Sequence, residues 1–409
     1  MHYIITALGC KVNQYEAQAI ETLLHAHGFT AAADGEPVDL IVVNTCAVTA
    51  EGGRKSRQMI RKLREEHPQA LCAVCGCWSQ LSPEDAASIG ADVVHGSGSK
   101  QAFVDDILRA FREHAPVTCV DNPVQRFDFE PLPAGAAYGR TRAMLKIQDG
   151  CNNFCTYCVI PYTRGRIRSL PLEEMARQAA HLAAEGYREL VLTGIEIASY
   201  GRDLPGKLTL ADAVETVAAA APQMRLRLGS FEPTVITEDF CRRAAATGQV
   251  CRHFHLSLQS GCDRTLARMN RKYNTAEFLA CVERLRRYFP GCALTADMIR
   301  ASPARRRQIR RPQWRFWSRS ALRPCMFSRT PAAPARRRTP CRSSSATRSN
   351  RRARMRRSAW PMPASSAIWC SRSARRCPFC SRRSMTAAGS DTRTTIVWCA
   401  LRGTICADL

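Results

Sequence analysis

The sequence contains no apolar run long enough to span a lipid bilayer, and its start lacks the pattern of a signal peptide. We therefore expect no membrane span. It also lacks the framework of a small disulfide-linked secreted protein, although residues 1–299 hold 14 of its 21 cysteines. This usage favours a reducing cytoplasm, where cysteines bind metal or fill the core.

Lysine is absent after residue 299, and acidic residues are almost absent. Residues 300–409 contain 27 Arg but only Asp391 and Asp408, which gives a net charge of +25. The whole chain also has a net charge of +25, so residues 1–299 hold 33 basic and 33 acidic residues. The global charge is therefore no argument that the first three-quarters of the chain bind nucleic acid.

The same C-terminal region has five of the six Trp residues, seven cysteines and no sustained helical or strand period. A GC-rich gene read in the wrong frame yields Arg, Pro, Ser, Ala, Cys and Trp and loses Lys. We interpret residues 300–409 as an aberrant, Arg-rich tail that follows a frameshift near Ile299–Ala301, and we expect it to be disordered. A genuine basic tail is the alternative.

Residues 1–115 alternate between strand and helix patterns, which predicts a doubly wound α/β domain with a parallel sheet. Strands are expected at Tyr3–Leu8, Leu40–Val43, Leu71–Val74 and Asp92–Val94. Helices are expected at Glu16–His27, Arg54–Glu66 and Gln101–Glu113. Residues 116–140 are rich in Pro and Gly and are interpreted as a linker.

Residues 141–299 contain five further strand patterns with helical stretches between them. The strands are expected at Met144–Ile147, Leu190–Leu192, Arg225–Leu228, His255–Leu258 and Leu294–Asp297. This spacing predicts a partial β/α barrel that is incomplete, because it stops at its fifth strand where the aberrant tail begins.

A CxxxCxxC motif, formed by Cys151, Cys155 and Cys158, lies just past the first of these strands. Four cysteines would saturate a zinc ion or an iron–sulfur cluster, whereas three leave one iron of a 4Fe–4S cluster open. This spacing is typical of the radical S-adenosylmethionine (SAM) enzymes, in which SAM occupies the open iron. A structural zinc site or three unrelated core thiols are the alternatives.

Three more cysteines follow strand patterns of the first module: Cys10, Cys46 and Cys77. The carboxyl ends of parallel strands meet at one edge of a sheet, so a second three-cysteine cluster is plausible there. Cysteine is also among the most buried residue types, and the position of these three alone does not exclude core roles. We interpret Cys72 and Cys75, inside an apolar strand, as core residues.

Several separate motifs occur in the order seen in the radical-SAM methylthiotransferases, and residues 1–299 resemble that family. The motifs are Gly9-Cys10-Lys11-Val12-Asn13-Gln14-Tyr15-Glu16, Asn44–Thr49, Gly76–Gln80, the 151–158 loop, His255–Asp263 and Arg268–Arg271. The first motif resembles the MtaB-type branch. Enzymes of that branch convert N6-threonylcarbamoyladenosine at position 37 of tRNA to its 2-methylthio derivative.

The resemblance implies a cytoplasmic enzyme with two 4Fe–4S clusters and SAM as cofactors. Cys10, Cys46 and Cys77 would hold an auxiliary cluster, where one SAM methylates sulfur. A second SAM, cleaved at the Cys151, Cys155 and Cys158 cluster, would give the radical that removes the C2 hydrogen of adenine. The implied partners are the anticodon loop of tRNA and an electron donor such as flavodoxin or ferredoxin.

Six further residues are candidates for binding SAM, because they lie in the cluster loop or at strand ends. Tyr157 occupies the aromatic position of the motif and would pack near the adenine of SAM, although a core Tyr is as plausible. Gly194 would let the backbone approach SAM, and Glu196 would accept a hydrogen bond from its ammonium group. The strand-end candidates are Ser230, Glu232 and Gln259.

Basic residues are candidate RNA contacts, although charge runs are usually solvated faces. Arg164, Arg166 and Arg168 alternate after the cluster loop, and residues 54–64 hold six basic side chains. Family members end in a small β-barrel RNA-binding domain, which the tail does not resemble. Alternative functions are a truncated relative, inactive or only SAM-cleaving, or a methylthiotransferase for another modified adenosine or a ribosomal protein.

Overall fold

The computed structural model describes residues 1–133, 142–301 and 323–329 of the chain, all within the unit Met1–Arg342. Part of the expected linker and most of the expected tail lie outside these residues. None of the helices among the described residues is both long and apolar enough to cross a membrane.

The first module is a six-stranded, all-parallel sheet with the order β2-β1-β3-β4-β5-β6. The strands are β1 (His2–Ala7), β2 (Thr30–Ala31), β3 (Leu40–Thr45), β4 (Leu71–Gly76), β5 (Val93–His95) and β6 (Val117–Cys119). The four expected strands are present, and β2 and β6 add one short strand at each edge.

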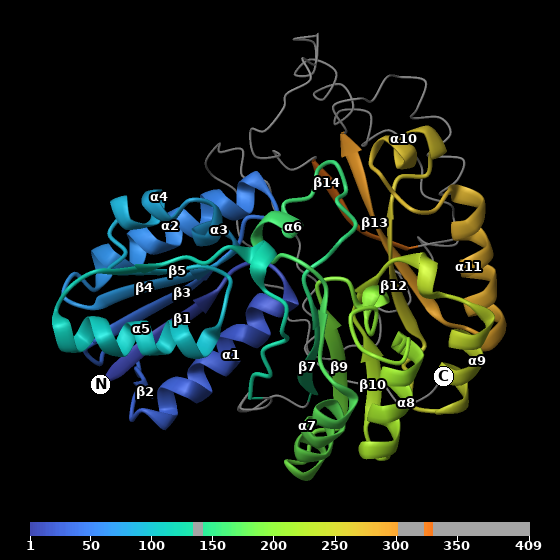
Figure 1. Ribbon diagram of the computed structural model, residues 1–409, viewed down its shortest axis with the longest axis horizontal. Helices are drawn as coiled ribbons and strands as arrows, with labels where there is room; N and C mark the ends of the chain where they lie inside the picture. Colours follow the sequence, from blue (N-terminus) through green and yellow to red (C-terminus); the bar gives the residue numbers. More distant parts are fainter. Residues whose placement is uncertain (134–141, 302–322, 330–409) are drawn as a thin grey trace, which may run out of the picture. The chain divides into compact units, whose positions relative to one another are not determined.

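Helices cover both faces of this sheet, as Figure 1 shows. They are α1 (Lys11–Ala26), α2 (Ala50–Glu66), α3 (Cys77–Leu81), α4 (Pro83–Ser88) and α5 (Lys100–Glu113). Side chains of a strand alternate between the faces, so Leu40 and Val42 share a core with α1 and α5, while Ile41 and Val43 share one with α2, α3 and α4. This arrangement confirms the predicted doubly wound fold.

The second module contains two four-stranded sheets, with the orders β10-β9-β7-β8 and β11-β12-β13-β14. Their strands are β7 (Arg142–Asp149), β8 (Arg168–Ser169), β9 (Glu189–Gly194), β10 (Arg225–Leu228), β11 (Ser230–Phe231), β12 (His253–Gln259), β13 (Ala293–Ala301) and β14 (Arg323–Arg329). All pairs are parallel except β7 with β8.

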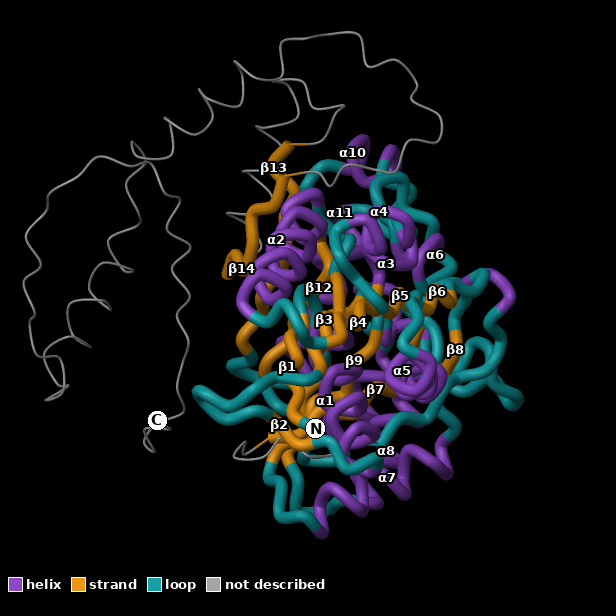
Figure 2. The backbone as a smooth tube through the Cα atoms, turned by 90° about the vertical axis from the view of Figure 1, so that its left-hand side faces the viewer, coloured by secondary structure: helices purple, strands orange, loops and turns teal. Residues whose placement is uncertain are grey.

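The helices of this module follow its strands, and the larger ones share one apolar core with them. The α-helices are α6 (Ile160–Thr163), α7 (Leu172–Ala184), α8 (Leu210–Ala220), α9 (Glu238–Ala246), α10 (Asp263–Arg268) and α11 (Thr275–Tyr288). Short 3-10 turns occur at η1 (Pro123–Gln125), η2 (Ile197–Ser199) and η3 (Pro233–Val235). Helix α1 of the first module lies beside β7 and β9 (Figures 1 and 2).

The second of these two sheets, β11-β12-β13-β14, extends further than we expected. We predicted that it stops at a fifth strand, but β13 continues to Ala301 and β14 pairs with it in parallel, from within the region assigned to the tail. An unpaired strand edge exposes backbone donors and acceptors, which a neighbouring extended segment satisfies. The composition of residues 300–409 did not indicate strand β14, because the short apolar run Cys325–Phe327 contributes little to an average over the whole region.

Candidate active site

The first cysteine triad lies at the carboxyl edge of the parallel sheet. Cys10 follows β1 as the cap of α1, Cys46 follows β3, and Cys77 is the first residue of α3, directly after β4. The turns that bring them together are tight. Gly9 has a φ of 98°, and a Cβ atom there would come within 2.5 Å of the Cys46 sulfur. The strand ends thus converge as predicted.

The pKa values of Cys10 and Cys46 depend on their burial and on the other thiols of this triad. Burial raises the pKa of Cys10, and the nearby Cys77 raises it further. Burial likewise raises the pKa of Cys46 to about 11, with smaller contributions from Cys77 and Cys10. The raised pKa values keep Cys10 and Cys46 as neutral thiols at pH 7, and a bound metal centre would favour their thiolate forms.

The second triad lies on the loop between β7 and α6. Gly150, with a φ of 69°, starts this loop, and a Cβ there would meet the carbonyl of Arg166. The N–H of Cys151 donates to the Gly165 carbonyl at 3.0 Å, and that of Cys158 donates to the Cys155 carbonyl at 2.9 Å. Burial raises the pKa of Cys151 to about 12 and that of Cys158 to about 11.

A segment far along the chain holds this loop in place. The Asn270 amide donates to the carbonyls of Asn153 and Phe154 at 3.0 and 3.1 Å. The N–H of Thr156 donates to the Met269 carbonyl at 3.2 Å, and the Thr156 hydroxyl donates to that of Arg268 at 3.1 Å. Sequence reasoning identified residues 268–271 only as part of a resemblance, and this clamp gives the motif a structural role.

The two triads lie on adjoining segments, because α3, which begins at Cys77, contacts α6, which begins two residues after Cys158. Within the described residues, neither triad brings its sulfur atoms within 4.8 Å of one another, the spacing that one ion would need. The three thiolates of each triad would bind three different irons of a 4Fe–4S cluster and leave its fourth iron open.

A buried ionic network joins α1 to the cluster loop of the second module. Arg164 is fully buried, and its guanidinium donates to both carboxylate oxygens of Glu16, at 2.5 and 2.9 Å, and to Asn13 Oδ1 at 2.8 Å. Lys146 pairs with Glu16 at 3.0 Å and with Asp149 at 2.7 Å. Burial alone would raise the pKa of Glu16, but Arg164 and Lys146 hold it well below its usual range.

This network corrects one expectation. Arg164 and Arg168 are buried and paired with carboxylates, so they are unavailable for tRNA phosphates. Of the three alternating arginines, only Arg166 is exposed. Residues at i, i+2 and i+4 share one face only along a regular strand, and residues 164–167 form an irregular connection between α6 and β8.

Three of the SAM candidates gather beside the second triad. Arg271 forms an ion pair with Glu232 and donates a hydrogen bond to the Tyr157 hydroxyl, and its guanidinium lies 5.7 Å from the centre of the Tyr157 ring. Burial raises the pKa of the Cys155 thiol. The nearby Arg271 lowers this pKa, and the carboxylates of Glu232 and Glu196 raise it. The sequence analysis missed Arg271, although it lies within the quoted 268–271 motif.

Glu196 and Gly194 hold the neighbouring backbone. Glu196 is buried, and its carboxylate accepts the N–H groups of Glu232 at 3.0 Å and Ala198 at 3.2 Å. Burial raises its pKa to about 8, and the Glu232 carboxylate adds to the shift. A Cβ at Gly194 would lie 2.8 Å from the Gln148 carbonyl, so close packing against β7 explains this glycine.

The last two candidates are less closely tied to the triad. The Ser230 hydroxyl lies 3.3 Å from that of Ser257 on β12. Gln259 ends β12 in the left-handed conformation, with a φ of 61°. Their roles remain predictions.

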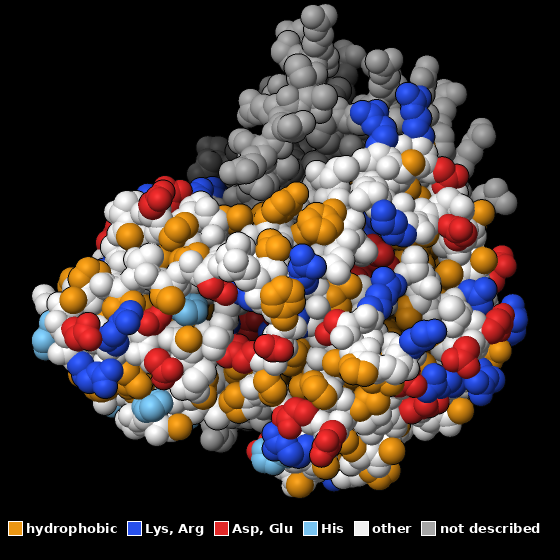
Figure 3. All heavy atoms as spheres, viewed as in Figure 1, with side chains coloured by type: hydrophobic (Ala, Val, Ile, Leu, Met, Phe, Trp, Pro, Cys, Tyr) orange, Lys and Arg blue, Asp and Glu red, His pale blue; other side chains and the backbone are white. Residues whose placement is uncertain are grey.

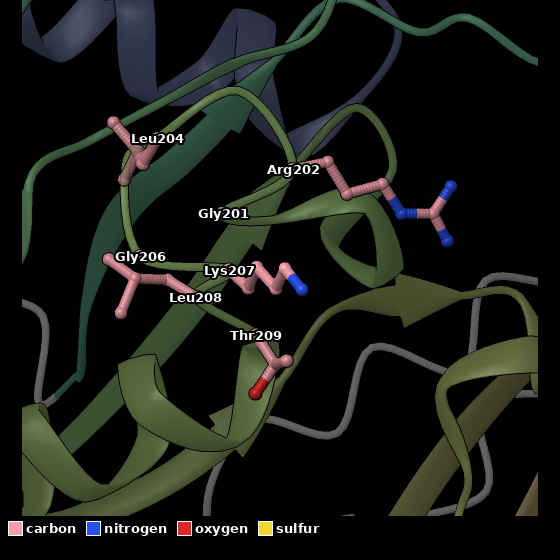
Figure 4. A pocket seen from close by; sticks show the side chains of 7 residues that line it. All are labelled: Gly201, Arg202, Leu204, Gly206, Lys207, Leu208 and Thr209. Atoms are coloured by element: carbon pink, nitrogen blue, oxygen red, sulfur yellow. The ribbon is translucent and has the colours of Figure 1, made fainter.

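Two other features of the described residues are separate from the triads. A pocket of about 460 Å³ is formed by the loop before α8 (Figure 4). Its lining residues are Gly201, Arg202, Leu204, Gly206, Lys207, Leu208 and Thr209. His95, Asp106 and Cys119 place their ligand atoms within 4.8 Å of one another. Asp106 there is already hydrogen-bonded to His95 and paired with Arg109, so we assign no metal.

Residues 145–303 match the Radical SAM superfamily, and residues 2–96 match the Uncharacterized protein family UPF0004. The threonylcarbamoyladenosine tRNA methylthiotransferase MtaB of Bacillus subtilis is 37% identical over 297 residues, which are 72% of this chain and 66% of the relative. The tRNA-2-methylthio-N(6)-dimethylallyladenosine synthase of Syntrophomonas wolfei is 37% identical over 309 residues, 74% of this chain and 69% of the relative.

The fold is also similar to that of the radical SAM methyltransferase TsrM from Kitasatospora setae, with a TM-score of 0.56 and 15% identity. That similarity covers 78% of this chain and 71% of TsrM. The chain spans about two thirds of the length of the two tRNA-modifying relatives. The two matched domains contain the first and the second triad in that order, and the relatives just described point to the same family. The chain therefore belongs to the radical-SAM methylthiotransferase family and is of the MtaB type.

Proposed function

We propose that this chain is a tRNA methylthiotransferase that converts N6-threonylcarbamoyladenosine at position 37 to its 2-methylthio derivative. The observation that carries the proposal is the pair of three-cysteine sites, which lie on adjoining segments because α3, which begins at Cys77, contacts α6 just after Cys158. One site would hold the sulfur to be transferred, and the other would activate the substrate carbon. Their proximity would let one bound adenosine reach both.

The cofactors are two 4Fe–4S clusters and SAM. Cys10, Cys46 and Cys77 would bind the auxiliary cluster, and Cys151, Cys155 and Cys158 the other. When bound, these cofactors supply methyl transfer to sulfur and a radical able to remove the unreactive C2 hydrogen of adenine. Within the chain, the Asn270 clamp would fix the second cluster loop, and the burial of four of the six cysteines would limit access of water.

Tyr157, Glu196, Ser230 and Gln259 would bind SAM beside the second triad. Tyr157 offers an aromatic face, and the Arg271–Glu232 pair fixes the orientation of its hydroxyl. Glu196 would meet the ammonium group, and that cation would favour the ionised carboxylate despite its burial. Ser230 and Gln259 would complete the site from the ends of β11 and β12.

Members of a second branch are also similar to this chain, since the Bacillus and Syntrophomonas proteins have equal identity to it. The motif Gly9–Glu16 favours threonylcarbamoyladenosine. Isopentenyl-type adenosines or a ribosomal protein are the second choice. The partners would be the tRNA anticodon loop and a flavodoxin- or ferredoxin-like donor, and a tRNA substrate would place the protein in the cytoplasm.

We also propose that residues from about 300 onward derive from a shifted reading frame. The sequence as written would then depart from its relatives after about residue 300 and be a weak or inactive enzyme. The coding DNA around Met298 tests this directly. A one-base shift should restore a continuation with ordinary acidic content.

Mass spectrometry of tRNA nucleosides tests the function. A methylthiotransferase-deficient host would express the chain as written, a frame-corrected chain, or the corrected chain with Cys155→Ala. The corrected chain should give 2-methylthio-threonylcarbamoyladenosine, and the Cys155→Ala variant should give none. Product only on isopentenyladenosine would overturn the branch assignment, and full activity of the chain as written would overturn the frameshift.

A further inference from the structure

Exposed aromatic side chains are concentrated at one place in the described residues. Phe127, Phe154 and Tyr162 are 68%, 54% and 59% exposed, and all other Phe, Tyr and Trp side chains within residues 1–133 and 142–299 are buried or half-buried. An exposed aromatic ring is costly to solvate, so a cluster of them marks an interaction surface. In Figure 3, hydrophobic side chains gather over the position that α6 has in Figure 1.

The three rings come from adjoining segments. The ring centres of Phe154 and Tyr162 are 6.2 Å apart in an edge-to-face arrangement. The guanidinium of Arg166 lies 5.8 Å from the centre of the Phe127 ring. The segment that carries Phe127 packs on the turn after α6, because Arg126 donates to the Thr163 carbonyl and Gly165 fits against Pro123.

The surface is held in an unusual conformation. Phe154 has a φ of 47°, which side chains other than glycine rarely adopt. The two hydrogen bonds from Asn270 to the Asn153 and Phe154 carbonyls maintain it. The exposed position of this ring is therefore imposed by the fold, and such local strain is often found at ligand-binding sites.

Several basic side chains are exposed on the segments beside the rings, where Asp128 and Asp263 are exposed as well. Arg166 is exposed at the rings, and Arg264, Arg268 and Lys272 are exposed on and just after α10. Helix α10 borders the cluster loop, because the Arg268 carbonyl accepts the Thr156 hydroxyl. Aromatic rings with interleaved basic groups are the means by which proteins bind unpaired bases and their phosphates.

We propose that Phe127, Phe154, Tyr162 and Arg166 form a stacking platform for unpaired nucleotides of the RNA substrate next to the reacting adenosine. This rests on the proposed function, because it assumes an RNA substrate. The platform lies on the cluster loop and its neighbour, so nucleotides stacked there would hold an extruded base close to the second triad. A flat, paired RNA could not present its bases in this way.

A probe inside the RNA separates the platform from the Arg-rich tail. The tail carries 27 Arg and will bind any RNA through phosphates, but that binding weakens steeply with salt. We would titrate the full chain into a synthetic RNA hairpin with 2-aminopurine in its unpaired loop, with excess duplex RNA as competitor. Fluorescence quenching of this base reports stacking rather than phosphate contact.

Phe127→Ala and Tyr162→Ala should each weaken the loop affinity about 5- to 150-fold and reduce the quenching. Phe127→Trp should retain both, whereas Phe127→Leu, which keeps an apolar side chain without a π face, should behave as Ala. Arg166→Ala should weaken binding, while Arg242→Ala, at an exposed arginine on α9, should not. Unchanged iron content would show that the cluster loop is intact.

The outcomes distinguish the two proposals. If wild type binds the loop and the Phe127→Ala/Tyr162→Ala double variant binds it equally well with equal quenching, the platform is wrong and the RNA substrate stands. If wild type does not prefer the loop to duplex, both proposals fail. Preference for an acidic peptide or an anionic vesicle over RNA would assign the surface to another partner and overturn the platform.

Discussion

Arg164 and Glu16 are 148 residues apart in the sequence and form a buried ion pair with two parallel hydrogen bonds. Glu16 lies on α1, six residues after Cys10, and Arg164 lies six residues after Cys158. The pair therefore connects the elements that carry the two cysteine triads. Its surroundings, Lys146, Asp149 and Asn13, are also buried.

Replacement of Arg164 by Met should destabilise the protein strongly. The change leaves Glu16 and Asp149 buried without one of their cations, a defect that typically costs about 3–5 kcal/mol. Urea unfolding followed by circular dichroism measures it. The control is Arg177→Met, which removes an exposed arginine paired with Glu174 and should change stability little. Equal effects of the two substitutions would contradict the central role of Arg164.

Acid should weaken the same network. The pKa of Glu16 is lowered in the folded protein, so its stabilising effect is fully present above its ordinary pKa of 4.5 and is lost as the pH falls below that value. Glu16→Gln should be less stable than wild type at neutral pH. The difference should shrink when urea unfolding of the metal-free proteins is repeated at about pH 3. A difference that stays constant with pH would show that the carboxylate charge is not responsible.

The local sequence pattern was sufficient to predict much of this structure. Apolar runs bounded by polar turns located the strands, and parallel strands necessarily bring Cys10, Cys46 and Cys77 to one edge. Arg164 shows what local pattern cannot supply. A charged residue in a polar turn such as Thr163-Arg164-Gly165 resembles a surface position, and only the partner on α1, 148 residues away, makes its burial possible.

Asn270 illustrates the same limit at the site. Its contacts are with backbone carbonyls of the cluster loop, and backbone acceptors leave no trace in composition or periodicity. The order of the motifs along the sequence indicated that residues 268–271 belong to a family motif. It did not show which atoms of the cluster loop they contact. The same applies to β14, whose pairing depends on the open edge of β13.

Removal of single cysteines should separate the two clusters. After anaerobic reconstitution, Cys155→Ala and Cys46→Ala should each lose about half of the iron of the wild type, because each breaks one three-cysteine site. Cys72→Ala is the control, since Cys72 is fully buried in β4 and belongs to the core. Iron content equal to wild type in Cys46→Ala would refute the auxiliary site. Stoichiometric zinc without iron–sulfur absorbance would refute both.

Loss of the Asn270 clamp should affect the cluster loop more than the fold. Asn270→Ala removes its two hydrogen bonds to the cluster loop, worth about 1 kcal/mol each, and frees the carbonyls of Asn153 and Phe154; it also removes the exposed hydrogen bond from Lys272. We expect a modest loss of stability, and faster loss of iron from the second cluster in the presence of a chelator. Cys46→Ala as a background isolates that cluster. Asn274→Ala, which removes only a helix cap of α11, should leave iron release unchanged.

Arg271 should govern SAM binding through Tyr157 and Glu232. Because its guanidinium pairs with Glu232 and holds the Tyr157 hydroxyl, Arg271→Met leaves a buried carboxylate unpaired and the ring free to turn. SAM affinity, measured by equilibrium dialysis on the reconstituted protein, should fall at least about tenfold, the equivalent of 1.4 kcal/mol. Tyr157→Phe keeps the ring and loses only the hydroxyl, so it should bind SAM more nearly as wild type does. Iron content separates a binding defect from loss of the cluster. If Arg271→Met retained both full iron and full SAM affinity, the group formed by Arg271, Glu232 and Tyr157 would serve the fold alone, and SAM would have to be received elsewhere.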